Sequence, residues 1–321
     1  MINVKDIPVD IEEIRLWVNG YRDLHALSWT KLATESGVPA GTLQPFCKGT
    51  YQGDNERIAR EMFKFMQSVE DRTQREQSIP VNPGFFETDT ATRIRTCLQI
   101  AHMGRITVVA TGPGTGKTMA VNDYAERAQP VWRATMKPST ATVNSMVVAI
   151  LKAFGIEIRG TQWTYSGSNT IVERMRGRAG LLVIDEANHL TIDSFEELRS
   201  WHDETGVGIC LLGNEELLRR IESGRMRDRF ARLNSRIAMR HVQRLPLVED
   251  VEAFCNAWGL SDPGIRKYLE KIALTPDAGG LRECRQLVEH GAMIAASEER
   301  GLTLSDLRDA QRTRATRWID A

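Results

Sequence analysis

The sequence ITVVATGPGTGKTMAVNDYA, residues 106–125, passes from an apolar run through a glycine-rich loop into a helical pattern. Phosphate oxygens bind backbone N–H groups only at close range, so a phosphate-binding loop is built from residues without bulky side chains. Lys117 would reach the β- and γ-phosphates of a nucleotide, and Thr118 would offer its hydroxyl to Mg²⁺. The helix that starts beside the loop adds the positive end of its dipole. The sequence therefore predicts a nucleotide site formed by Gly112, Pro113, Gly114, Thr115, Gly116, Lys117, Thr118 and Met119.

Position 111 departs from the usual pattern of such loops, which has glycine where this chain has Thr111. We expect Gly112 and Gly114 to supply the flexibility that the loop needs. One alternative is a glycine-rich turn with an accidental Lys-Thr pair, but the strand pattern before it and the helix pattern after it favour the phosphate loop. A dinucleotide-binding G-x-G-x-x-G pattern does not fit, because the glycines stand at positions 112, 114 and 116.

Around this loop, apolar runs alternate with helical patterns, which is typical of an α/β fold with a parallel sheet. The strand candidates are 106–110, 131–134, 181–184, 207–212 and 237–245, and the helix candidates are 117–128, 142–154, 170–176 and 194–205. Residues 1–70 and 246–321 are helical in pattern, and the polar segment 71–93, which contains Pro80 and Pro83, is typical of a linker. The expected domains are therefore residues 1–70, an α/β core at 94–245 and an all-α domain at 246–321, with the linker at 71–93.

Two carboxylates, Asp185 and Glu186, follow the apolar run LLVI at 181–184. Open α/β sheets bind ligands at the carboxyl ends of their strands. We expect Asp185 to hold the Mg²⁺ and Glu186 to orient and deprotonate the water that attacks the γ-phosphate. The interval between Lys117 and Asp185 is long enough for two more βα units, so a further strand is expected in the sheet between the strands that precede these two motifs.

Two further polar residues are candidates for contact with the γ-phosphate. Asn214 follows the next apolar run and could position the attacking water. Alternatively, it caps the helix that begins with Glu215 and Glu216. Arg282 opens a helix behind two glycines and could fold back onto a nucleotide phosphate, or it could be an ordinary exposed helix residue.

Residues 218–240 are unusually basic, with eight arginines against Glu222 and Asp228. A solvated helical face normally carries acids as well, so this run indicates an anionic partner. The phosphate of a nucleotide on a neighbouring subunit and the DNA backbone both fit.

Composition excludes several classes of protein. The 321 residues include 42 Lys+Arg and 42 Asp+Glu, and this net charge of zero argues against a protein that coats nucleic acid by bulk charge. No apolar run approaches the ~18 residues of a membrane span, and the N-terminal residues lack the apolar segment of a signal peptide. The five cysteines form no C-x-x-C and the six histidines no H-E-x-x-H, so neither a disulfide framework nor a structural zinc site is expected. These features predict a cytoplasmic protein.

Five motifs, TGPGTGKT, LLVIDEANH, LLGN, LNSRI and GGLRE, stand in an order that resembles the AAA+ ATPases and, more narrowly, the Mu B family of phage transposition proteins. The resemblance covers nearly the whole chain. It implies an AAA+ P-loop core with a parallel sheet, a small helix-turn-helix domain before it and an all-α, lid-like domain after it. It also implies ATP and Mg²⁺ as cofactors. The implied roles are Walker A for Lys117 and Thr118, Walker B for Asp185 and Glu186, sensor 1 for Asn214, sensor 2 for Arg282 and the arginine finger for Arg236, with Arg232 as the alternative.

Two regions are candidates for contact with DNA. The segment LSWTKLATESGVPAGTLQPFCKG, residues 27–49, has the spacing of a helix-turn-helix whose second helix, about 40–47, would present Thr42, Gln44 and Lys48. The alternative is a three-helix protein-docking domain, since residues 1–70 are net negative. In the core, the resemblance implies that the loops carrying Lys137 and Arg159 face a central DNA. Contacts to the DNA backbone alone would make binding salt-dependent and nearly independent of sequence.

These features, with the resemblance, predict an ATPase that oligomerises on double-stranded target DNA as a helical filament or ring. It would deliver this DNA to a DDE transposase and activate the transposase in the cytoplasm of a bacterial host, and ATP hydrolysis would drive disassembly. Two alternatives remain open. A helicase-loader-type AAA+ ATPase would bind a hexameric helicase, and an ATPase-linked transcriptional regulator would show a sharp sequence preference.

Overall fold

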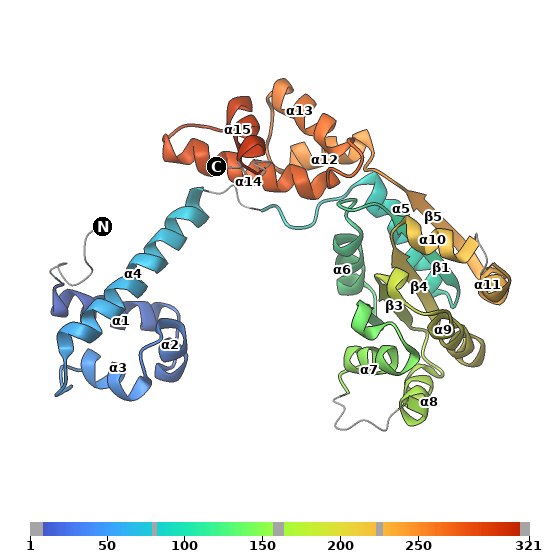
Figure 1. Cartoon of the computed structure of the whole chain (residues 1–321), viewed down its shortest axis with the longest axis horizontal. Coiled ribbons are helices and arrows are strands. Elements are labelled where there is room, and N and C mark those ends of the chain that lie inside the picture. The colour runs from blue at the N-terminus through green and yellow to red at the C-terminus, as the bar shows by residue number, and fades with distance from the viewer. Residues whose placement is uncertain (1–8, 79–81, 157–163, 223–226, 315–321) are drawn as a thin grey trace, which may run out of the picture. The chain divides into compact units, whose positions relative to one another are not determined.

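The computed structural model divides into two compact units, Met1–Ile79 and Pro80–Ala321. The structure describes residues 9–78, 82–156, 164–222 and 227–314. The first unit contains α1 (Ile11–Leu24), α2 (Trp29–Ser36), α3 (Ala40–Cys47) and α4 (Asn55–Ser78) (Figure 1).

In the first unit, α2 and α3 follow each other after a short turn. The Ser28 hydroxyl caps α2 by accepting from the Lys31 amide at 3.2 Å, and Gly37, with φ of 75°, ends it. Leu43 and Phe46 of α3 are fully buried in the core of this unit. The bounds of α3 are those expected for the second helix of the predicted helix-turn-helix.

The segment 71–93, predicted as a linker, is helical at both ends. Helix α4 continues to Ser78, and α5 (Asp89–His102) begins after Thr88, whose hydroxyl accepts from the Ala91 amide at 3.0 Å. Residues 71–78 contain neither proline nor glycine and include several good helix formers, so the helix begun at Asn55 propagates through them. Helix therefore extends into both ends of the predicted linker, and the boundary between the two units, at Ile79 and Pro80, lies within it.

In the second unit, a parallel five-stranded sheet has the order β2-β3-β4-β1-β5. The strands are β1 (Ile106–Thr111), β2 (Val131–Thr135), β3 (Leu181–Asp185), β4 (Gly208–Gly213) and β5 (Ile237–Gln243). All five were predicted, with bounds that differ by one or two residues. A strand does lie between β1 and β3, as expected, but it is β4, which comes later in the chain.

Helices cover both faces of the sheet (Figure 1). Successive residues of β3 alternate between two cores, Leu182 and Ile184 on one face and Leu181 and Val183 on the other. Helices α5 and α6 (Lys117–Arg127) contribute to the second of these cores. The first core is completed by α7 (Val143–Ala153), α8 (Thr164–Met175), α9 (Ile192–Thr205), α10 (Glu215–Glu222) and α11 (Arg227–Asn234). Two short 3₁₀ helices, η2 (Pro138–Thr140) and η3 (Ala187–His189), follow β2 and β3.

Helix α8 is longer than the predicted helix at 170–176, since it begins at Thr164. Its first turns, TYSGSN, consist of poor helix formers, so local propensity indicated a loop. Packing explains the difference: a Cβ at Gly167 would lie 2.7 Å from Val147 and 3.1 Å from Leu151, both on α7. The glycine therefore lets α8 pack closely against α7, and this tertiary contact outweighs the weak local preference.

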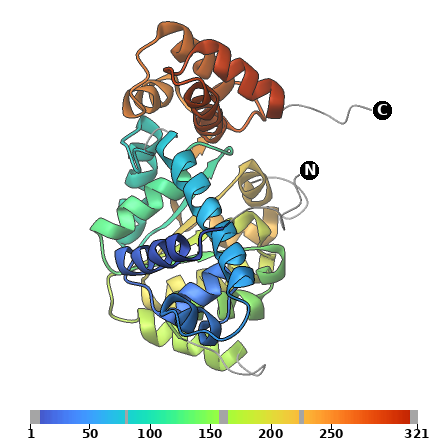
Figure 2. The same cartoon turned by 90° about the vertical axis from the view of Figure 1, so that its left-hand side faces the viewer.

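The C-terminal part is all-α, as predicted, and consists of α12 (Val248–Ala257), α13 (Pro263–Ala273), α14 (Gly280–Ser297) and α15 (Leu304–Arg314). These helices share their own apolar core and lie at one end of the sheet (Figure 2). Asp250 of α12 ties them to the core, because its carboxylate accepts from the Thr90 amide at 2.9 Å. Gln243, at the end of β5, donates to the Thr90 hydroxyl at 2.6 Å. Among the described helices, none combines the length and the apolar character needed to cross a membrane.

Candidate nucleotide-binding site

The loop between β1 and α6 has the backbone that a phosphate site needs. Gly114 and Gly116 have positive φ angles of 72° and 90°, and α6 begins directly after Gly116. The Lys117 ammonium donates to the carbonyl oxygen of Thr111 at 2.6 Å and to that of Gly213 at 3.2 Å. These carbonyls end β1 and β4, so the ammonium lies at the carboxyl edge of the sheet, where ligands bind in such folds.

The charge of Lys117 depends on its surroundings. Burial lowers its pKa, and the nearby carboxylates of Glu186 and Asp185 oppose this by raising it. The guanidinium of Arg282 lowers the pKa further. A triphosphate bound beside the ammonium would favour its charged form.

Thr111 occupies the position where the usual loop pattern has glycine. Its φ angle is not positive, so the backbone there does not require glycine. The Thr111 hydroxyl lies 2.7 Å from the hydroxyl of Thr115, which donates to the carbonyl of Gly112 at 3.0 Å. Because both threonines are buried, this pair satisfies two polar groups that would otherwise be costly, and it ties the start of the loop to its middle.

The two carboxylates after β3 have different environments. Asp185 is only 4% exposed, and its Oδ1 accepts from the Glu186 amide at 3.0 Å while its Oδ2 accepts from Arg133 of β2 at 2.7 Å. Glu186 has φ of 55°, a left-handed conformation that costs a non-glycine residue about 1 kcal/mol or more. Sequence reasoning missed Arg133, although an arginine inside a short, half-buried strand is a signal that it has a buried partner.

Residues suited to Mg²⁺ stand on either side of the loop. Thr118 is on the exposed first turn of α6, and Asp185 ends β3. Within the described residues, no cluster of three or more His, Cys, Asp or Glu side chains could hold a metal. Mg²⁺ takes oxygen ligands, usually with only one or two from the protein and the rest from water and substrate phosphates. A hydroxyl and a carboxylate beside a phosphate loop therefore fit this ion.

Asn214 and Arg282 line the same cavity as Lys117 and Glu186. The Asn214 Oδ1 accepts from the Glu216 amide at 3.0 Å, so this side chain caps α10, as its alternative role predicted. Its Nδ2 has no hydrogen-bond partner within the described residues and could donate to a ligand. Arg282 is exposed on the first turn of α14.

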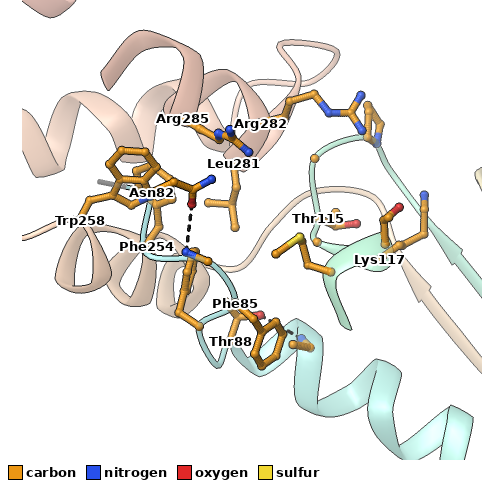
Figure 3. A pocket seen from close by; sticks show the side chains of 18 of the residues that line it. Asn82, Phe85, Thr88, Thr115, Lys117, Phe254, Trp258, Leu281, Arg282 and Arg285 are labelled. Atoms are coloured by element: carbon orange, nitrogen blue, oxygen red, sulfur yellow. Dashed lines mark hydrogen bonds between the residues drawn. The ribbon is translucent and has the colours of Figure 1, made fainter. Parts of the chain in front are cut away.

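The cavity has a volume of about 450 Å³, and its other end is apolar. Phe85 and Phe86 come from the segment before α5, and Phe254 and Trp258 come from α12 and its C-terminal end (Figure 3). The ring centroids of Phe86 and Phe254 are 6.1 Å apart, and those of Phe254 and Trp258 are 5.6 Å apart. An apolar, aromatic slot of this kind suits a flat base. None of these aromatic residues was predicted from the sequence, although two adjacent phenylalanines in a polar stretch, Phe85 and Phe86, indicate an apolar contact there.

Arg236 is not brought into this cavity. It precedes β5, and Ile237 pairs with Ile106 at the start of β1, whereas the phosphate loop follows the end of β1. Arg236 therefore lies at the amino ends of the strands, opposite to the carboxyl ends that the loop follows. Its Nε donates to Asp203 of α9 at 2.5 Å, which raises the pKa of Arg236 and lowers that of Asp203. The alternative finger, Arg232, is exposed, and its guanidinium has no hydrogen-bond or ion-pair partner within the described part of the chain.

The residues predicted to contact DNA come from three separate parts of the chain. Lys137 is exposed, follows the end of β2 by two residues and occupies the N-cap position of η2. Arg159 lies outside the described residues. Thr42 and Gln44 of α3 are half-buried and Lys48 is exposed, all in the first unit.

Comparisons with known proteins identify relatives of this chain. A family model described as "AAA domain" matches residues 101–221, and one described as "Mu B transposition protein, C terminal" matches residues 235–313. The chain is 30% identical over 305 residues to the "ATP-dependent target DNA activator B" of Escherichia phage Mu, which covers 95% of this chain and 96% of that protein. It is 31% identical over 263 residues to the "Mu-like prophage FluMu DNA transposition protein B" of Haemophilus influenzae, with coverage of 80% and 88%.

Solved structures share the fold. Cdc6p from Pyrobaculum aerophilum superposes with a TM-score of 0.53 at 15% identity, covering 70% of this chain and 65% of that one. A Drosophila ORC structure bound to DNA gives a TM-score of 0.54 at 14% identity, with coverage of 76% and 66%. The chain thus spans about two thirds of each of these proteins. At such identities the likeness shows the fold alone, an AAA+ P-loop α/β core.

Proposed function

The chain belongs to the Mu B transposition protein family and is a transposition-related AAA+ ATPase, and from this premise we propose that it assembles on target DNA with ATP, delivers that DNA to a transposase and activates the transposase. The curated relative from phage Mu carries the words "ATP-dependent" and "target DNA activator" in its name. The proposal extends both properties to this chain.

The nucleotide would lie in the cavity that Lys117, Glu186, Asn214 and Arg282 line. The aromatic end would take the adenine, and the loop amides and the Lys117 ammonium would take the phosphates. Thr118 and Asp185 would hold Mg²⁺, which would neutralise part of the phosphate charge. Glu186 would orient the attacking water and accept its proton, and the Asn214 amide would help to position that water.

The position of Arg236 is the observation that carries the assembly proposal. Arg236 lies at the sheet edge opposite to the phosphate loop of its own chain, so it cannot contact the nucleotide in that chain's cavity. A second copy could present this arginine to the γ-phosphate, as trans-acting arginines do in related phosphoryl-transfer sites. Asp203 would hold the Arg236 guanidinium until the second copy docks, and a nucleotide phosphate would then replace the Asp203 carboxylate as its partner.

DNA would be bound by the assembled cores through Lys137 and Arg159, largely at the backbone and without sequence preference. The helices of the first unit would then act as a separate helix-turn-helix domain, with Thr42, Gln44 and Lys48 facing DNA. The remaining domains would be the ATPase core at 94–245 and the lid at 246–321. We place this activity in the bacterial cytoplasm, where a transposase meets its target DNA.

Electron microscopy of the full chain with long DNA of random sequence tests the proposal. With ATP and Mg²⁺, we expect filaments or rings on the DNA that disappear with ADP and do not form with Lys117→Ala. Arg127→Ala is a matched control, because this arginine is on the same helix but is exposed and pairs with Asp123. Addition of a purified transposase from the same element should speed ATP hydrolysis and disassembly.

The same experiment separates the alternatives. A helicase loader would assemble on DNA only with a hexameric helicase present, and a transcriptional regulator would bind one operator and not random DNA. Absence of ATP-dependent assemblies on random DNA would contradict the proposed function.

A further inference from the structure

Arg133 of β2 contacts two other elements with the two arms of its guanidinium. Its Nη2 donates to the Asp185 Oδ2 at 2.7 Å, at the end of β3. Its Nη1 donates to the Asn122 Oδ1 on α6. The Asp185 side chain is 6% exposed and the Arg133 side chain 27% exposed, so the pair lies mostly out of solvent.

The two partners of Arg133 belong to the two sides of the proposed Mg²⁺ site. Asn122 follows Thr118 by four residues on α6, so both side chains lie on the same face of that helix. Asp185 is the carboxylate on the other side. Arg133 therefore joins the helix that carries the hydroxyl ligand to the strand that carries the carboxylate.

The contact leaves Asp185 able to serve a metal. A carboxylate has about four acceptor positions, and Arg133 and the Glu186 amide occupy one on each oxygen. Two positions remain for a metal or for its bound water. The two contacts also fix the rotation of the carboxylate, because each oxygen is held by a different donor.

The contact of Arg133 carries an energetic cost. Its Nε is buried and has no hydrogen-bond partner within the described part of the chain. A buried, unsatisfied N–H costs about 1–3 kcal/mol. A lysine, with one compact ammonium, could keep the charge but could not span both partners in the same way.

We propose that Arg133 is a positioning residue that, together with Asn122, sets the spacing between Thr118 and Asp185 and so tunes the affinity for the divalent metal. This inference rests on the proposed Mg²⁺–ATP site. It predicts that metal affinity depends on the two simultaneous contacts of the Arg133 guanidinium, to Asn122 and Asp185, and not only on its positive charge.

The test measures binding of Mn²⁺, as a substitute for Mg²⁺, by electron paramagnetic resonance on the full chain loaded with a slowly hydrolysed ATP analogue. Arg133→Gln, Arg133→Lys and Asn122→Ala should each weaken Mn²⁺ binding by about 10-fold, the effect usual for residues that orient metal ligands. Affinity for the analogue in EDTA should stay within about twofold of wild type for all three, because the phosphate loop and base slot are untouched. Arg127→Gln, which removes an exposed arginine five residues after Asn122 on the same helix, should bind Mn²⁺ as the wild type does.

The outcomes separate three cases. If Arg133→Lys and Asn122→Ala bind Mn²⁺ normally, or if Arg133→Gln binds it more tightly, Arg133 acts only as a charge and the inference is overturned. If all variants lose nucleotide binding in EDTA as well, the two contacts of Arg133 are general structural contacts and the inference also fails. A wild-type chain whose nucleotide binding does not respond to metal would instead contradict the proposed Mg²⁺–ATP site itself.

Discussion

The main-chain amide of Leu281 donates a hydrogen bond of 3.0 Å to the carbonyl oxygen of Gly114, so α14 contacts the loop between β1 and α6 through the backbone of both. The approach is close: a Cβ on Gly114 would lie 1.9 Å from the carbonyl oxygen of Gly279. A change in the backbone of this loop when phosphates bind would therefore displace the residues at the start of α14. This contact gives a physical route by which nucleotide state could alter the orientation of the lid.

Gly114→Ala should weaken nucleotide binding by about 10-fold or more, since it adds the steric clash with Gly279 to the ~1–2 kcal/mol cost of a left-handed alanine. Titration with a fluorescent ATP analogue measures this. Gly301→Ala is the control, because position 301 is open and its φ is not positive. Wild-type affinity in Gly114→Ala would show that the loop and lid separate without cost.

Thr111→Val should lower the free energy of unfolding by about 1–2 kcal/mol, because it removes the hydroxyl bonded to Thr115 and leaves the buried Thr115 oxygen with one partner fewer. Thr111→Ser keeps the hydroxyl and should stay closer to wild type. Urea unfolding of the full chain compares the two. Equal stability of the valine and serine variants would rule out a role for the hydroxyl pair.

Glu186→Gln should reduce ATP hydrolysis by about 100-fold or more while nucleotide binding remains, because glutamine can hold a water but cannot accept its proton. Steady-state hydrolysis and analogue binding are the two measurements. ATP-dependent assemblies of this variant on DNA should be long-lived. The exposed Glu126 on α6 provides a control as Glu126→Gln, and normal turnover by Glu186→Gln would remove Glu186 from catalysis.

Arg236→Ala should slow hydrolysis only where copies assemble, since the arginine is proposed to act on a neighbour's nucleotide. Mixing Arg236→Ala with Glu186→Gln should restore part of the activity, because the second variant still presents its arginine to the intact site of the first. Hydrolysis by the mixture, measured against each variant alone, decides this. If Arg232→Ala behaves in this way and Arg236→Ala does not, the finger is Arg232.

The Asp306–Arg300 pair should make the stability of the lid depend on pH. The Asp306 carboxylate accepts hydrogen bonds from the Arg300 guanidinium and the Thr303 amide, and these hold the pKa of Asp306 well below its usual range. The carboxylate is therefore more easily ionised in the folded than in the unfolded chain. The stabilisation is therefore complete above about pH 4, the pKa of an unfolded aspartate, and is lost as the pH falls below it. Asp306→Asn should lower the melting temperature at pH 7 by a few degrees, at ~2–4 °C per kcal/mol.

This difference between Asp306→Asn and wild type should shrink as the pH approaches 3. Melting curves at pH 7, 5 and 3 test the trend. Arg312→Ala is the control, because the Arg312 side chain is 81% exposed. This variant should melt within about 1 °C of wild type at each pH. A constant difference across the pH range would mean that the Asp306 carboxylate does not carry the effect.

The sequence by itself determined the phosphate loop, the five strands and the acidic end of β3. Each of these is encoded in consecutive residues: glycines that permit positive φ, apolar runs that are buried on both faces, and polar residues directly after a strand. The all-α character of the C-terminal part follows from periodicity in the same way. For these features, local preference and the final fold point in the same direction.

Only the tertiary structure decided which distant residues meet. The apolar end of the cavity joins Phe86 with Phe254, which are far apart in the chain, and Arg133 reaches Asp185 across neighbouring strands. Helix α8 forms against its local propensity because Gly167 packs on α7, and Arg236 faces away from its own nucleotide site because β5 runs parallel to β1. Such contacts arise from strand order and packing between separate segments, and no run of consecutive residues contains that information.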